Sequence, residues 1–163
     1  MSLTKRVAGM ILVACGVINN ALTQPLVELL KTTTGSTVQF AEFCCSPTLV
    51  MTEMAEKMGL TTYRFSHYNG FDFHTKLGFE NGLREVKRTK PRMAWVSTPC
   101  KYYSQMQNAN QRTDKQIENL RRNRQRANVF NMRVAKIALT VVSYGGHIYW
   151  EWPRGCSAWK AAA

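Results

Sequence analysis

The chain has 163 residues, 45% of them hydrophobic and 20% charged, so it is long enough for one domain with a buried core and too short for two full domains. Only 5 prolines and 10 glycines are present, and no apolar stretch reaches 18 residues, which excludes a fibrous or disordered chain and a membrane-spanning helix. The 22 basic and 10 acidic residues give a net charge of +12, which favours a polyanionic partner, with nucleic acid as the leading class.

Residues 1–36 are predicted to form an N-terminal extension that contains a short strand or helix. Lys5 and Arg6 precede an apolar run from Val7 to Ile18, a pattern that loosely resembles a signal peptide. Two glycines interrupt the run and no A-x-A cleavage pattern follows, so a buried strand or helix is favoured over a targeting signal. A proline start then predicts a short helix from Pro25 to Lys31.

A strand, a turn and a helix are predicted next. The β-branched and aromatic residues from Thr37 to Phe43 are typical of a strand, and Pro47 suits the first turn of a helix that ends at Gly59. Apolar side chains recur at helical spacing along that helix and are predicted to face the core. They are Leu49, Met51, Met54, Ala55 and Met58.

Two further strands and one helix are predicted between residues 60 and 97. Leu60–Ser66 is the second strand, and the stretch 69–73 (NGFDF) supplies a turn. A helix over Glu80–Arg88 is stopped by the following proline, and Met93–Ser97 forms an apolar run typical of a strand covered on both faces.

A long helix and a final strand complete the pattern. Thr113 and Gln116 have the spacing of a capping box, and two consecutive glycines at 145 and 146 end the helix. The residues predicted to form its core face are Ile117, Leu120, Ala127, Phe130, Val134, Ile137 and Val141. The aromatic stretch His147–Trp152 is the last strand.

Strands and helices therefore alternate through residues 37–163, which predicts a single Rossmann-like α/β domain with a short, mostly parallel sheet and helices on both faces. In such sheets ligands bind beyond the carboxyl ends of the strands. This rule selects four segments as candidate sites. They are Glu42–Cys45, Ser66–Asp72, Pro99–Cys100 and Glu151–Pro153.

The five cysteines are predicted to be reduced thiols, because their number is odd and their spacing is not that of a disulfide scaffold. No C-x-x-C or H-x(3–5)-H pair occurs, so no metal site is expected. Reduced thiols and a basic surface favour an intracellular setting, with the nucleus as one option.

The order of these segments resembles the S-adenosylmethionine-dependent methyltransferases of the DNA cytosine-5 type. The likeness rests on the segment 42–47 (EFCCSP), the acidic loop 70–72 (GFD), the segment 97–100 (STPC) and the segment 151–153 (EWP), and it covers roughly residues 37–160. Overall, the chain is still more similar to methyltransferase-like segments of transposon-type polyproteins, through the additional stretches 107–112 (QNANQR) and 157–159 (SAW). For those segments the resemblance implies no established activity.

The resemblance implies a role for each residue of the candidate site. The thiolate of Cys100 would attack a pyrimidine ring carbon, and Glu151 would pair with the ring nitrogen as a general acid. Glu42 and Asp72 would bind hydroxyl and amino groups of S-adenosylmethionine, beside Cys44, Ser46 and Pro99. A duplex target would have to be flipped out, and a further domain or chain would supply target recognition.

Structural interpretations stay open for the same residues. Cys100 is equally well interpreted as an inert thiol at a strand end, and Asp72 as the cap of a turn. Glu151 pairs with Arg154 in that interpretation, and Trp150, Trp152 and Trp159 form core packing. An active methyltransferase and a degenerate, inactive relative are therefore both compatible with the sequence.

The long helix suggests a second function class, a non-catalytic DNA- or RNA-binding module. Its N-terminal half and the loop before it are basic, and Tyr102 and Tyr103 lie upstream as candidate stacking residues for bases. The residues predicted to contact phosphates are Arg112, Lys115, Arg121, Arg122, Arg124 and Arg126. A solvated basic face is the structural alternative.

Overall fold

The computed structural model describes residues 38–46, 50–109 and 113–161, so the predicted N-terminal extension lies outside the described residues. The elements follow one another as β1 (Phe40–Phe43), α3 (Val50–Lys57), β2 (Thr62–Phe65), the 3₁₀ turn η2 (His67–Asn69), α4 (Lys76–Thr89), β3 (Met93–Val96), the 3₁₀ turn η3 (Lys101–Tyr103), α5 (Gln105–Ala109), α6 (Asp114–Ser143), β4 (His147–Trp150) and α7 (Ala158–Ala161).

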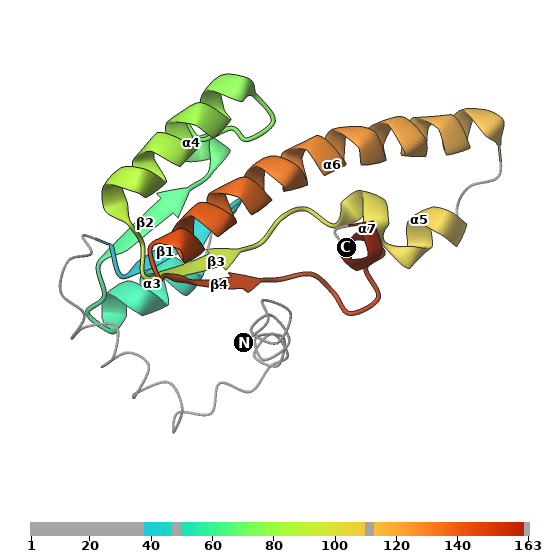
Figure 1. The fold of residues 1–163 in the computed structure, drawn as a ribbon. Helices are drawn as coiled ribbons and strands as arrows, with labels where there is room; N and C mark the ends of the chain where they lie inside the picture. The colour runs from blue at the N-terminus through green and yellow to red at the C-terminus, as the bar shows by residue number, and fades with distance from the viewer. Residues whose placement is uncertain (1–37, 47–49, 110–112, 162–163) are drawn as a thin grey trace.

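The four strands form one parallel sheet in the order β2-β1-β3-β4 (Figure 1). In the register of the sheet, Ala41 lies between Tyr63 and Ala94, and Ala94 pairs with Ile148 on its other side. Every strand has four residues. The prediction of a Rossmann-like α/β fold with a short parallel sheet is confirmed.

Helices cover the two faces of the sheet in separate layers. On one face, Ala41 and Phe43 of β1 pack with Val86 of α4 and Ile137 of α6 in the main core. On the other face, Phe40 packs with Ala55 of α3 and with Leu60. This division follows from the strand period of two, because neighbouring residues of a strand point to opposite faces.

Helix α4 packs against the loop that precedes it because two of its residues are glycines. It begins at Lys76, four residues earlier than predicted, since the Thr75 side chain accepts a hydrogen bond from the Gly78 backbone N–H at 3.0 Å. A Cβ atom on Gly78 would lie 2.1 Å from the carbonyl oxygen of Asp72, and one on Gly82 would lie 2.5 Å from the Phe73 ring. The glycines therefore let the Asp72–Phe73 backbone approach the helix.

Helix α6 begins with the predicted capping box, in which Thr113 and Gln116 exchange side-chain-to-backbone hydrogen bonds. Its second half lies on the sheet, and its first half extends beyond the sheet past η3 (Figure 1). There Tyr103, Trp152, Cys156 and Ala158 form a separate small core. The helix thus joins the sheet to this aromatic cluster.

Two predictions of buried apolar residues are wrong at the helix ends. Ile117 of α6 is 53% exposed, because the first turns of the helix extend past the sheet. Met58 is 39% exposed, since it follows the last residue of α3. Among the helices that the structure describes, none has both the length and the hydropathy needed to cross a bilayer.

Candidate ligand cavity at the carboxyl edge of the sheet

The chain leaves the two central strands, β1 and β3, toward opposite faces of the sheet. From β1 it continues to α3, whereas from β3 it continues to α6 on the other face. This divergence is a topological switch point, where parallel α/β sheets have a crevice. A cavity of about 490 Å³ lies beyond the carboxyl ends of these two strands and of β2. Its lining comes from the segments after β1 (Cys44, Cys45, Ser46), after β2 (Ser66, His67, Tyr68, Phe71, Asp72, Phe73, His74) and after β3 (Pro99), and from Phe130 of α6.

Cys44 makes the first turn of this cavity in an unusual backbone conformation. Its φ angle is +63°, in the left-handed region where a side chain costs roughly 1–2 kcal/mol relative to glycine. Its backbone N–H donates to the Phe65 carbonyl at 2.9 Å, which ties the turn to β2. Burial raises the pKa of the Cys44 thiol well above its usual range, and neighbouring Cys45 adds to this shift. Cys44 therefore lines the cavity as a neutral thiol.

Asp72 is the carboxylate that lines the cavity. One of its oxygens, Oδ1, accepts a hydrogen bond from the His74 backbone N–H at 2.9 Å, and the Asp72 carbonyl oxygen accepts from the Thr75 hydroxyl at 2.9 Å. Asp72 therefore caps the turn before α4, which is its structural interpretation. The second carboxylate oxygen, Oδ2, accepts no hydrogen bond from the described residues.

Aromatic rings also line the cavity. The His74 ring lies 4.4 Å from the Phe130 ring, centroid to centroid, and Phe130 also contacts Phe73 at 6.3 Å. Arg133 of α6 donates to the carbonyl oxygens of Phe73 and His74 at 2.9 and 2.6 Å, so this loop is held against the helix. The cavity thus combines an aromatic side with a fixed carboxylate.

Glu42 lies inside β1 rather than beyond its end, and it does not line the cavity. It faces α3, is fully buried, and its Oε2 atom accepts a hydrogen bond from the Thr52 hydroxyl. Its other oxygen, Oε1, accepts no hydrogen bond from the described residues. The structure therefore brings Cys44, Ser46, Asp72 and Pro99 together at the cavity and leaves Glu42 on the other face of the sheet.

Cys100 follows Pro99 but packs away from the cavity lining. It precedes η3 and contacts the aromatic cluster of Tyr103, Trp152 and Cys156 as a half-buried side chain. Burial raises the pKa of the Cys156 thiol. The four cysteines of the described chain are free thiols, as predicted.

Glu151 is exposed and accepts hydrogen bonds from Trp95 Nε1 and from the Ser97 hydroxyl, both at 3.2 Å. Trp95 belongs to the face of the sheet that α3 covers, so Glu151 is drawn toward that face. In the described part of the chain Glu151 forms no hydrogen bond with Cys100 and no ion pair with Arg154. Trp150, Trp152 and Trp159 pack edge to face, in line with a core role.

The predicted cations of α6 fall into two groups, and Arg112 lies outside the described residues. Arg124 is half-buried, donates to the Tyr102 carbonyl at 3.0 Å and lies over the Tyr103 ring, so it holds η3 in place. The others are exposed. Arg121 and Arg122 contact Glu118, whereas Lys115 and Arg126 have no ion-pair partner among the described residues. No acidic residue follows Glu118 in α6.

The sequence prediction included Ser66 in a candidate segment but missed His74 and Phe130 as lining residues. His74 follows the predicted turn directly, and its position after β2 was the available signal. Phe130 was predicted as core only, because its contact with His74 depends on how α6 crosses the loop.

No family model matches this chain, and neither the curated proteins nor the solved structures contain a significant match.

Proposed function

We propose that the chain is a nucleic-acid methyltransferase-like domain that binds S-adenosylmethionine in the cavity beyond the carboxyl ends of β1, β2 and β3. The observation that carries the proposal is the cavity itself. Its volume of about 490 Å³ falls within the range of small-molecule sites, and it lies where Rossmann-like sheets bind ligands.

The lining residues fit a nucleoside cofactor. The unused Oδ2 atom of Asp72 is an acceptor for ribose hydroxyl groups, and the His74 and Phe130 rings offer an apolar surface to a purine. Cys44 lines the cavity with a left-handed φ angle, a backbone conformation that glycine adopts most readily. Bound S-adenosylmethionine would supply an electrophilic methyl group.

Cys100 and Glu151 remain the proposed nucleophile and general acid. In the arrangement described, Cys100 packs on the aromatic cluster and Glu151 is hydrogen bonded to Trp95 and Ser97. For both to act on one pyrimidine ring, the two side chains would have to leave these contacts. The geometry therefore supports cofactor binding more strongly than methyl transfer.

The cofactor proposal is tested by calorimetric titration of the reduced chain with S-adenosylmethionine. Asp72→Asn keeps an oxygen that can accept from the His74 N–H, so the turn is preserved while the charge is lost. A hydrogen bond to a charged group contributes about 1.5–3 kcal/mol, so we expect the dissociation constant to rise roughly tenfold or more. Asp114→Asn, on the exposed first turn of α6, is the matched control. Equal affinity in Asp72→Asn and the unmodified chain would contradict the proposed site.

A second function, binding of nucleic acid by α6, is favoured by the run of cations without acidic residues after Glu118. We expect the variant with Lys115→Gln, Arg122→Gln and Arg126→Gln to bind a single-stranded oligonucleotide more weakly. If each cation neutralises one phosphate, the slope of log affinity against log salt becomes shallower by about 2. The control removes three exposed cations elsewhere through Lys57→Gln, Arg84→Gln and Lys87→Gln. Equal slopes for the two triple variants would contradict a role for α6.

A further inference from the structure

Strand β2 is an open edge of the sheet in the described part of the chain, because it pairs only with β1. The carbonyl oxygens of Thr61 and Phe65 accept hydrogen bonds from the β1 side. In a parallel pair, alternate residues of a strand face the partner. The backbone N–H and C=O groups of Thr62 and Arg64 therefore point away from β1. Exposed edges of this kind are templates for a further strand.

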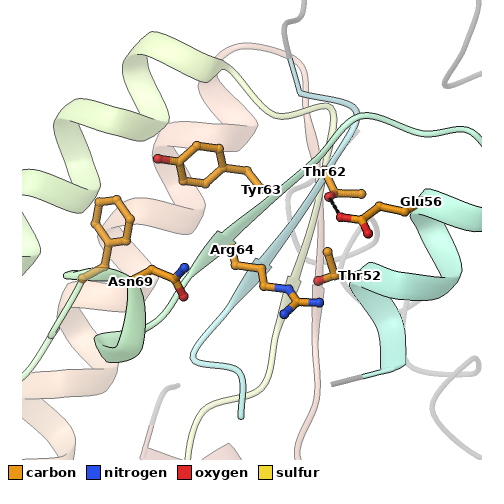
Figure 2. A pocket seen from close by; sticks show the side chains of 7 residues that line it. Thr52, Glu56, Thr62, Tyr63, Arg64 and Asn69 are labelled. Carbon is orange, nitrogen blue, oxygen red and sulfur yellow. Dashed lines mark hydrogen bonds between the residues drawn. The ribbon is translucent and has the colours of Figure 1, made fainter. Parts of the chain in front are cut away.

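A shallow hollow of about 350 Å³ lies along this edge (Figure 2). Its lining comes from α3 (Thr52, Glu56), from β2 (Thr62, Tyr63, Arg64) and from the loop after β2 (Asn69, Phe71). Figure 2 shows Tyr63 and Arg64 leaving β2 on opposite sides of the strand. The hollow therefore offers a polar side next to α3 and an aromatic side next to the loop, where the Tyr63 and Phe71 rings meet edge to face at 6.2 Å.

The polar side contains a guanidinium group that forms no ion pair with the described residues. Arg64 is half-buried and forms no ion pair or side-chain hydrogen bond with the described residues, whereas Glu56 accepts from the Thr62 hydroxyl at 2.6 Å. Asn69 uses its side-chain oxygen to accept from the Ser66 hydroxyl at 2.7 Å, which leaves its amide N–H groups as donors. A carboxylate can accept two parallel hydrogen bonds from the planar guanidinium group of an arginine.

We propose that the edge of β2 binds an extended segment of a partner protein by strand addition, with a carboxylate side chain opposite Arg64 and apolar side chains over Tyr63 and Phe71. The backbone groups of Thr62 and Arg64 supply the pairing, and the strand period of two places the acidic and apolar residues on alternate sides. A polynucleotide fits less well, because it lacks the alternating N–H and C=O groups that pair with a strand edge. The hollow adjoins the cavity beyond the strand ends, since Phe71 lines both, but Thr52, Glu56 and Arg64 on its polar side do not line that cavity.

The test is an NMR titration of the full chain with a five-residue, acetylated and amidated peptide, Thr-Val-Glu-Val-Thr. We expect the amide signals of Thr62 and Arg64 to shift most. Arg64→Gln is expected to weaken binding roughly tenfold or more, as is a peptide with Gln in place of Glu. Arg84→Gln, an exposed arginine of α4 that bonds Asn81, is the control and should bind normally.

A peptide with N-methyl groups at both valines and at the glutamate keeps the side chains but loses the backbone donors on both edges of the strand, so it tests strand addition in either direction and independently of any protein variant. The proposal predicts that it does not bind. Equal binding of the N-methylated peptide, equal binding to Arg64→Gln, or no binding of the Glu peptide at millimolar concentration would overturn the proposal. Displacement of the peptide by an oligothymidylate whose own affinity requires Arg64 would also overturn it, in favour of a nucleic-acid site.

Discussion

Replacement of Gly78 by alanine is expected to lower the free energy of unfolding by about 2–3 kcal/mol, at the upper end of the usual cost of overpacking. A Cβ atom here would lie 2.1 Å from the Asp72 carbonyl oxygen and 2.6 Å from its carbonyl carbon, so the backbone itself must move. Elsewhere in a helix the same substitution would stabilise by about 1 kcal/mol, which makes the sign of the effect diagnostic. Urea denaturation followed by circular dichroism measures it.

Leu77→Ala is the control for this prediction, because Leu77 precedes Gly78 in α4 and is 68% exposed. We expect its effect to stay within about 0.5 kcal/mol. The Gly78 variant should also bind S-adenosylmethionine more weakly, since Asp72 lines the cavity. A variant at Gly78 that is as stable as the unmodified chain would show that α4 and the Asp72 turn are not packed as described.

Replacement of Thr52 by valine is expected to lower the free energy of unfolding by about 1–3 kcal/mol, because a buried oxygen of Glu42 loses its hydrogen-bond donor while the shape of the side chain is kept. Thr52 is the donor to Glu42, and both residues are buried between β1 and α3. The Oε1 atom of Glu42 already accepts nothing from the described residues, so valine leaves the carboxylate without a donor there. Thermal unfolding at neutral pH measures the loss.

Two further variants separate this hydrogen bond from packing. Thr52→Ser keeps the hydroxyl and should recover most of the stability. Adding Glu42→Met to Thr52→Val removes the uncompensated carboxylate, and the double variant should be more stable than Thr52→Val alone. A Thr52→Val protein as stable as Thr52→Ser would contradict the buried Glu42–Thr52 contact.

The sequence was most informative where local patterns and tertiary packing agree. The four strands, the capping box of Thr113 and Gln116 and the end of α6 before Gly145 all follow from residue types and spacing. The start of α4 was predicted too late, because its first turn depends on the Thr75 cap and on space that Gly78 provides. Ile117 fits the periodicity of α6, but the sequence does not show where the sheet beneath the helix ends.

The sequence predicted which segments of the chain line the candidate site better than it predicted where their side chains point. The rule that ligands lie beyond the carboxyl ends of parallel strands selected Cys44, Asp72 and Pro99, and the resemblance added Ser46; all four line one cavity. It also selected Glu42, whose side chain points to the face of the sheet that α3 covers. Neighbouring residues of β1 point to opposite faces, so a shift of one position would have placed this side chain on the face of α6. The hydrogen bonds of Glu151 to Trp95 and Ser97 were not predictable either, because they depend on the pairing of β3 with β4.

The most direct test of the central claim is an amide NMR map of the reduced, ¹⁵N-labelled chain titrated with S-adenosylmethionine. Saturable shifts at residues 44–46 and 66–74 and at Phe130, reduced in the Asp72→Asn variant, are the predicted result, because these residues line the cavity beyond the carboxyl ends of β1, β2 and β3. A folded protein whose spectrum does not change, or whose shifts gather elsewhere, would contradict the proposed cofactor site.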